Sequence, residues 1–187
     1  MRIAKTILLV ALGLLALPMP LAAQQAIDEV RIEKGQSLYK SRDYECDSCH
    51  GWAGRGKPAD HPYSTLNDGT KLEYGGNALV ASTMTRDEMV MMISCGRISS
   101  GVNIMPMYRG DAWTTAYPCW GKVAADIPEN QRPLRAPQRM LSPTDIELVV
   151  DYVQAVYQGK DMTWDWCRKY FDDFLRICEV WAERGIQ

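Results

Sequence analysis

The sequence shows no excess of positive charge, because its 187 residues include 21 lysines and arginines against 23 aspartates and glutamates. Domains that bind nucleic acids carry a basic patch as their electrostatic footprint, so this balance argues against nucleic acid as a partner. The chain also shows no internal repeat and no convincing alternation of apolar and polar residues that would indicate strands. The predicted fold class is therefore all-α, built around one main domain.

Long apolar runs are also missing. The longest, Ile7–Leu17, is shorter than the roughly 18 to 20 residues that a membrane span requires. It follows Arg2 and Lys5 and precedes the small residues of segment 21–23, which is the pattern of a cleaved secretory signal. We expect residues 1–23 to be that signal, with an uncleaved anchor as the alternative. The mature chain would then lie in the periplasm without a membrane span, and loss of the two signal cations would leave 19 basic against 23 acidic residues.

One short motif carries specific chemistry. Residues 46–50 read Cys-Asp-Ser-Cys-His, the C-x-x-C-H pattern by which c-type haem is attached. Cys46 and Cys49 would form the two thioether bonds, and His50 would be the proximal iron ligand. A thioredoxin-type redox pair would need a βαβ context, and a zinc site would need a second Cys/His pair; neither is visible. The motif occurs once, so we expect a single covalent haem c.

Three segments are predicted as helices. The first spans Asp28–Tyr44 and contains Gly35, which needs a packing explanation because glycine weakens a helix. The second begins at Thr85 with a capping box and stops at Gly96. The third has Ser142 as N-cap, Pro143 at the first helical position, and a stop at Gly159. Its apolar face comprises Ile146, Val149, Val150, Val153 and Val156.

A pure electron carrier needs a sixth iron ligand, and the segment Asn-Ile-Met-Pro-Met-Tyr offers Met105 and Met107. Met105 precedes a proline, which favours extended backbone and suits a loop that projects a thioether toward the haem. Met105 is the preferred distal ligand, with Met107 and then His61 as alternatives. Such His/Met ligation raises the reduction potential of a haem.

Four cysteines remain once the haem motif has used two, and an even remainder in an oxidising compartment suggests two disulfides. Three pairings are possible. We favour Cys95 with Cys119, which would brace the loop that carries Met105, and Cys167 with Cys178. The second pair is too far apart along a continuous helix to form a disulfide, so this pairing requires the tail to fold back.

A helix before C-x-x-C-H, a loop-rich middle and a terminal amphipathic helix resemble the class I cytochrome c fold. In that family the first and last helices cross closely, with a small residue facing an aromatic one. The resemblance implies that Gly35 and Tyr152 form this contact, which would account for the glycine.

Further motifs resemble a narrower family, the periplasmic cytochromes of the cytochrome cL and c-553i type. These motifs are the segments 93–97, Met105-Pro106, 116–121 and 141–153, followed by the tail with Cys167 and Cys178. Members accept electrons from pyrroloquinoline quinone (PQQ) methanol dehydrogenases. The resemblance therefore implies a quinoprotein dehydrogenase as electron donor, and a cytochrome or oxidase as acceptor, in methanol metabolism.

The expected organisation is a signal at residues 1–23, a cytochrome c domain at 24–160 and a C-terminal extension at 161–187. The extension is rich in aromatic residues, which either pack back on the haem domain or form a partner surface. Segment 126–140, stiffened by prolines and carrying three arginines, is expected to wrap over the haem edge as a solvated loop.

The predicted function is single-electron transfer by a periplasmic monohaem cytochrome, and not enzymatic catalysis. Two alternatives stay open. The chain could be a tightly bound haem subunit of a larger oxidoreductase or respiratory complex, attached through the aromatic tail. It could also be a haem enzyme or gas sensor with an open distal site.

Overall fold

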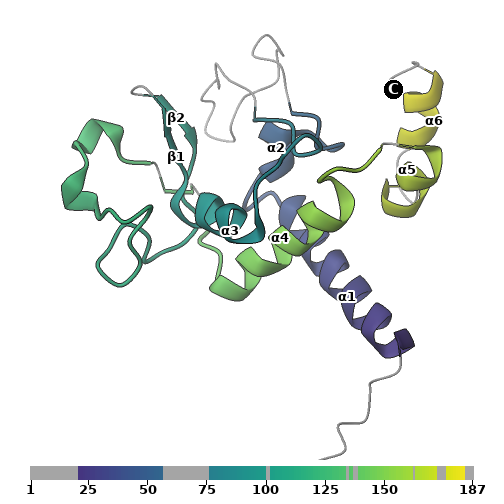
Figure 1. Ribbon diagram of the computed structural model, residues 1–187. Coiled ribbons are helices and arrows are strands. Elements are labelled where there is room, and N and C mark those ends of the chain that lie inside the picture. The colour runs from purple at the N-terminus through teal and green to yellow at the C-terminus, as the bar shows by residue number, and fades with distance from the viewer. Residues whose placement is uncertain are drawn as a thin grey trace, which may run out of the picture.

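The computed structural model describes residues 21–56, 76–99, 102–133, 135–136, 139–161, 163–171 and 176–183 (Figure 1). This part of the chain is helix-rich, as expected, and no helix in it is long and apolar enough to cross a membrane. Its elements are α1 (Leu21–Tyr39), α2 (Cys46–His50), α3 (Arg86–Cys95), β1 (Arg97–Ser99), β2 (Val102–Met105), two 3₁₀ turns at Ala124–Asp126 and Glu129–Gln131, α4 (Pro143–Val156), α5 (Trp164–Phe171) and α6 (Ile177–Glu183).

Helices α1 and α4 cross at the centre of the fold (Figure 1). The crossing is close because Gly35 has no side chain: a Cβ atom built there would lie 2.7 Å from the Cβ of Tyr152 and would collide with the backbone carbonyl of Leu148. The expected contact between Gly35 and Tyr152 is confirmed. The packing of the two helices explains the unfavourable glycine.

The starts of α3 and α4 follow the predicted caps. The Thr85 side chain accepts a hydrogen bond from the backbone N–H of Glu88, and Ser142 accepts one from Asp145, with the carboxylates completing both capping boxes. Each cap satisfies backbone N–H groups that have no partner within the helix. Helix α4 ends at Val156, three residues before Gly159, and all five predicted apolar positions on its face are buried.

The first predicted helix is displaced along the chain. It was expected to run to Tyr44, but α1 ends at Tyr39 and begins earlier, at Leu21. Beyond it the chain turns, and the Ser41 hydroxyl accepts a hydrogen bond from the backbone N–H of Asp43 at 3.1 Å. Serine competes for backbone groups in this way, which favours a turn over a further helical turn.

A short antiparallel hairpin, β1–β2, occupies a region expected to be loop. Ser99 pairs with Val102, Ile98 with Asn103, and Arg97 with Met105. The register shifts between the last two pairs, so Ile104 is an additional residue in β2, a β-bulge. The absence of strands was therefore a wrong expectation at this position, where the strands are too short for a clear alternating pattern.

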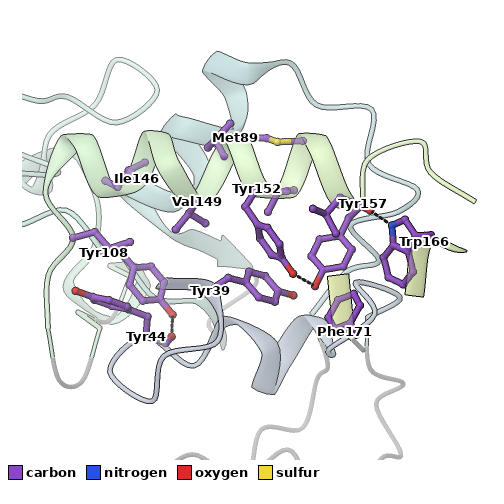
Figure 2. Close-up of a cluster of buried hydrophobic side chains, with 14 of the residues drawn as sticks. Tyr39, Tyr44, Met89, Tyr108, Ile146, Val149, Tyr152, Tyr157, Trp166 and Phe171 are labelled. Atoms are coloured by element: carbon purple, nitrogen blue, oxygen red, sulfur yellow. Dashed lines mark hydrogen bonds between the residues drawn. The ribbon is translucent and has the colours of Figure 1, made fainter. Parts of the chain in front are cut away.

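The main core lies between α1, α4 and the C-terminal tail and is rich in tyrosine (Figure 2). The rings of Tyr39, Tyr152 and Tyr157 lie 5.2 to 5.5 Å apart between centroids. Their hydroxyl groups are satisfied: Tyr39 donates to the carbonyl of Gly51 at 3.0 Å and Tyr157 to that of Trp52 at 2.7 Å. These bonds join the core to the segment that directly follows the C-x-x-C-H motif.

The C-terminal tail folds back on itself and packs on the core. The Cys167–Cys178 disulfide joins α5 to α6 with a Cα–Cα distance of 5.7 Å. Trp166 is buried and donates from Nε1 to the carbonyl of Val156 at 2.6 Å, while the buried Phe171 meets the Trp52 ring. Packing therefore accounts for these two aromatic residues, whereas Trp164 is 42% exposed.

Candidate functional site

A cavity of about 360 Å³ lies between α2, residues 76–84, α3, the hairpin and α4. The lining is predominantly apolar, and it includes Cys46, Cys49 and His50 of the motif together with Met105. Residues separated by more than 50 positions in sequence thus meet around one space. The methionines Met84, Met89 and Met92 and the charged residues Glu45 and Arg97 also line it.

The cysteines of α2 are distinguished from the other four in the chain. Cys46 and Cys49 lie outside the two disulfides, which use the other four cysteines. Burial, reinforced by the nearby Asp47, raises the pKa of the Cys46 thiol to about 12. The thiol is thus protonated at neutral pH, whereas a thioredoxin-type cysteine has a lowered pKa.

His50 is oriented by the backbone of residues 76–77. Its Nδ1 lies 2.8 Å from the carbonyl oxygen of Asn77. A carbonyl can only accept, so Nδ1 carries the proton and donates it, and Nε2 is left with a lone pair. This is the arrangement by which a second residue orients a metal-ligating histidine and sets its tautomer. Burial lowers the pKa of His50, which favours the neutral ring needed for ligation.

Gly76 makes this approach possible. Its N–H donates to the carbonyl of Cys49 at 2.9 Å, and a Cβ atom at this position would lie 2.8 Å from Nδ1 of His50. Gly56 similarly donates to the carbonyl of His50 at 2.9 Å. The backbone around the motif is therefore held by bonds to residues on its C-terminal side.

Met105 and Met107 lie in different surroundings. Met105 ends β2 at the bulge and lines the cavity with the motif. Met107 instead packs against a second buried cluster, which contains Cys95, Cys119 and Trp113. Of the other proposed ligands, His61 lies outside the described residues. Met89 is 5% exposed and belongs to the main core as well as to the cavity wall.

The segment that carries Met105 is held tightly at the end of α3. Gly96 caps this helix with φ +68°, and a Cβ atom there would lie 2.5 Å from the Met105 carbonyl oxygen and 2.8 Å from the Met107 nitrogen. The Cys95–Cys119 disulfide, with a Cα–Cα distance of 5.8 Å, ties the same helix end to the chain beyond Met107. Both disulfides therefore follow the pairing favoured from the sequence.

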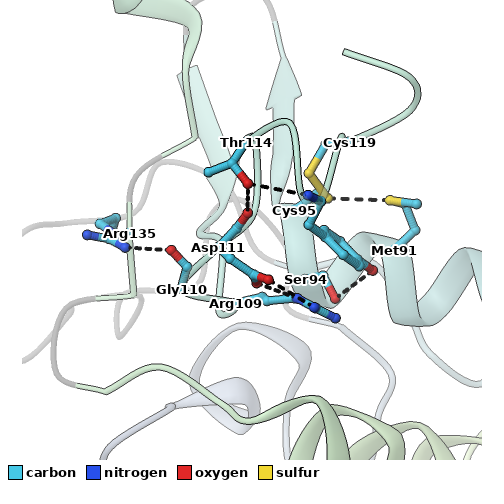
Figure 3. A network of polar contacts seen from close by, with 10 residues as sticks. Met91, Ser94, Cys95, Arg109, Gly110, Asp111, Thr114, Cys119 and Arg135 are labelled. Atoms are coloured by element: carbon cyan, nitrogen blue, oxygen red, sulfur yellow. Dashed lines mark hydrogen bonds and ion pairs between the residues drawn. A yellow bond between two sulfur atoms is a disulfide. The ribbon is translucent and has the colours of Figure 1, made fainter. Parts of the chain in front are cut away.

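Polar contacts complete this brace (Figure 3). Trp113 donates from Nε1 to the Cys95 carbonyl at 2.8 Å, and the Arg109 guanidinium stacks 3.7 Å from the centroid of the Tyr117 ring. Arg109 also forms two hydrogen bonds to Asp111, which lower the pKa of that carboxyl group. Segment 126–140, which was expected to be a solvated loop, is held here by Arg135, whose guanidinium donates to the Gly110 carbonyl at 2.9 Å.

The residues around the cavity fit a covalently attached haem. Two thiols outside any disulfide, an imidazole whose Nε2 is available and a thioether share a predominantly apolar space, and these are the donors that a c-type haem uses. In contrast, no group of three His, Cys, Asp or Glu side chains suited to a metal ion occurs among the described residues. A zinc-type site is therefore not formed in this part of the chain.

Sequence reasoning missed the residues that complete the site from a distance. Asn77, which orients His50, is 27 positions away from it and belongs to no motif. Arg97 was noted only as part of a family segment, although it lines the cavity. No local signal was available for either residue, because strands of three and four residues are too short for a clear alternating pattern.

Comparison with known proteins adds no relative: no family model, no curated protein and no solved structure matches the chain.

Proposed function

We propose that the chain is an exported monohaem c-type cytochrome that carries single electrons in the periplasm. The observation that carries this proposal is the convergence of Cys46, Cys49, His50 and Met105 on one predominantly apolar cavity, with the other four cysteines committed to disulfides. The C-x-x-C-H spacing supports it independently. The proposal includes no catalytic residue, because electron transfer requires only that the cofactor be held and its edge be accessible.

Each residue has a defined role in this proposal. Cys46 and Cys49 would anchor the haem covalently, and His50 would present Nε2 to the iron while Nδ1 stays bonded to Asn77. Met105 would supply the distal thioether. When bound, the haem supplies one-electron redox chemistry, and His/Met ligation favours a high potential. The apolar walls from α3 and α4 would exclude water from it.

The proposed fold is that of a class I cytochrome c, with residues 161–187 as an extension of the domain at 24–160. The close crossing of α1 and α4 at Gly35, and the position of the motif directly after α1, support this assignment. The disulfide between Cys95 and Cys119 would brace the distal segment. The tail would stabilise the proximal side through Trp166 and Phe171.

The proposed electron donor is a PQQ-dependent alcohol dehydrogenase, with methanol as substrate, and the acceptor is a downstream cytochrome or oxidase. This part rests on the resemblance of segments 93–97 and 116–121 to the cytochromes that serve methanol dehydrogenases. A subunit tightly bound through the aromatic tail is less well supported, because Trp166 and Phe171 are buried within the chain itself. Size-exclusion chromatography of the native protein separates the two ideas, since a shuttle elutes alone.

Haem attachment and ligation are tested on the protein exported from a host that matures c-type cytochromes. Wild type should carry one covalent haem by intact mass and show the charge-transfer band of methionine bound to ferric iron. The M105A variant should keep the haem and lose the band. Both M107A and M92A should retain it. Absence of covalent haem in the wild type would refute the proposal, and a haem without the band would favour an enzyme or sensor with an open distal site.

The donor is tested by mixing the oxidised protein with purified quinoprotein dehydrogenases and their substrates. We expect the haem to become reduced when methanol dehydrogenase turns over methanol. Reduction by a different dehydrogenase alone would show that the partner assignment is wrong while leaving the electron-transfer function intact.

A further inference from the structure

The cavity wall carries one cation that the proposed function has not used. Arg97 is the first residue after the Gly96 cap of α3, and its side chain is exposed while also lining the cavity. It therefore lies where the cavity meets solvent. Among the described residues, the other charged member of the wall is Glu45, next to Cys46.

The hairpin directs Arg97 and Met105 to the same space. The two residues are cross-strand partners, and such partners place their side chains on one face of a sheet. The bulge at Ile104 is what brings Met105, instead of its neighbour, opposite Arg97. Bulges re-aim side chains in this manner beside functional sites.

The Arg97 guanidinium has no hydrogen bond or ion pair with another described residue. Arg42 shares this property, but of the two only Arg97 lines the cavity. Other arginines of the fold do have partners. Arg86 pairs with Asp151, Arg109 with Asp111, and Arg135 donates to a backbone carbonyl. A guanidinium offers five donors in a planar fork that matches a carboxylate, so its unused donors favour a carboxylate ligand at the cavity mouth.

We propose that Arg97 binds a propionate carboxylate of the haem at the mouth of this cavity. The inference rests on the proposed function, because the carboxylate belongs to the cofactor assigned there. It adds a binding residue and a consequence for electron transfer. A fixed cation close to the haem disfavours the additional positive charge of ferric iron, so Arg97 raises the reduction potential.

The test compares R97Q and R97K with R42Q in the haem-loaded full-length protein. Arg42 is likewise exposed and joined to no described residue, but it does not line the cavity. We expect R97Q to lower the equilibrium constant for reduction by about two- to fivefold, or about 18 to 41 mV at 59 mV per tenfold. We expect R97K to retain most of the wild-type potential. R42Q should match the wild type.

Equal potentials for R97Q and R42Q, both carrying haem, would overturn the inference without affecting the proposed function. Failure of haem attachment in the wild type would instead overturn the proposed function. Loss of haem in R97Q alone would assign Arg97 to folding or maturation and would also overturn the inference. The reduction potentials of wild type and R97Q are also compared in chloride and in phosphate buffer. If the two potentials differ only in phosphate, Arg97 binds a free oxyanion and not a propionate, which would contradict the proposal.

Discussion

Gly35 lies directly against Tyr152, so that α1 and α4 approach to a distance that no side chain at position 35 would permit. A Cβ atom there would lie 2.7 Å from the Tyr152 Cβ and would overlap the Leu148 carbonyl. The Tyr152 hydroxyl in turn lies 2.8 Å from that of Tyr157, which donates to the Trp52 carbonyl. The crossing therefore sets the position of the segment that follows the C-x-x-C-H motif.

The G35A variant should be destabilised in spite of the better helix propensity of alanine. Propensity favours alanine by up to about 1 kcal/mol, but overpacking against a backbone carbonyl costs more because the carbonyl cannot rotate away. We expect a net loss of about 2 kcal/mol in the free energy of unfolding, measured by urea denaturation. The K34A variant, at an exposed position of the same helix, should differ from the wild type by less than about 0.5 kcal/mol. An equally stable G35A protein would contradict the close crossing.

The G96A variant should loosen the segment that carries Met105. Alanine at φ +68° is strained, and its Cβ would lie 2.5 Å from the Met105 carbonyl oxygen and 2.8 Å from the Met107 nitrogen. The expected result is a loss of stability of about 2 kcal/mol together with weakening of the methionine-to-iron charge-transfer band.

Gly159 provides the matched control for this substitution. Its φ is +65°, but a Cβ atom there would meet nothing within 4 Å. G159A should therefore show the backbone strain without the steric clash, with a smaller loss of stability and an unchanged band. Equal effects of the two variants on the band would argue against a role of Gly96 in placing Met105.

The parts of the fold that the sequence predicts well are set by local contacts. The capping boxes at Thr85 and Ser142 involve residues three positions apart, and the apolar face of α4 repeats with the helical period. The motif at 46–50 is local in the same sense. The chemistry proposed for it rests on residue types and spacing.

The parts that the sequence does not predict depend on distant contacts. The bond from His50 to Asn77 spans 27 positions, and neither residue 76 nor residue 77 carries a recognisable signal. The pairing of Arg97 with Met105 depends on a one-residue bulge in strands of three and four residues. Such short strands provide too little alternation to predict register.

Removal of the Cys95–Cys119 disulfide should lower the stability of the fold and should also weaken the ligation of the iron by Met105. The bridge closes 24 residues, and the chain-entropy estimate for such a loop is about 3 kcal/mol. We expect C95A/C119A to lose about that much stability and to show a charge-transfer band that disappears at lower temperature than in the wild type.

The Cys167–Cys178 bridge is the internal comparison, because it closes 11 residues and should contribute almost as much, also about 3 kcal/mol. It joins α5 and α6, which lie far from the β1–β2 hairpin (Figure 1). C167A/C178A should therefore lose similar stability while the band persists until global unfolding. Parallel loss of the band in both double variants would show that the first disulfide has no specific role at Met105.

The tyrosine core predicts a steep loss of stability at alkaline pH. Burial raises the pKa values of Tyr39, Tyr108, Tyr152 and Tyr157 above 10 in the folded protein. Below pH 10 the folded and unfolded states both keep these protons, so their contribution to stability is fully present. Above pH 10 only the unfolded state releases them, and stability falls with rising pH until the folded-state pKa values are reached.

The expected slope is about 1.4 kcal/mol per pH unit for each buried tyrosine, measured by urea unfolding between about pH 10 and pH 12. Y157F removes one of these groups, so its slope should be shallower by about that amount, although it also loses the hydrogen bond to the Trp52 carbonyl. V153A, at a buried position in the last turn of α4, just before Tyr157, should lower stability at every pH and keep the wild-type slope. An unchanged slope in Y157F would mean that Tyr157 ionises equally readily in the folded and unfolded protein, which its burial beside Tyr39 and Tyr152 argues against.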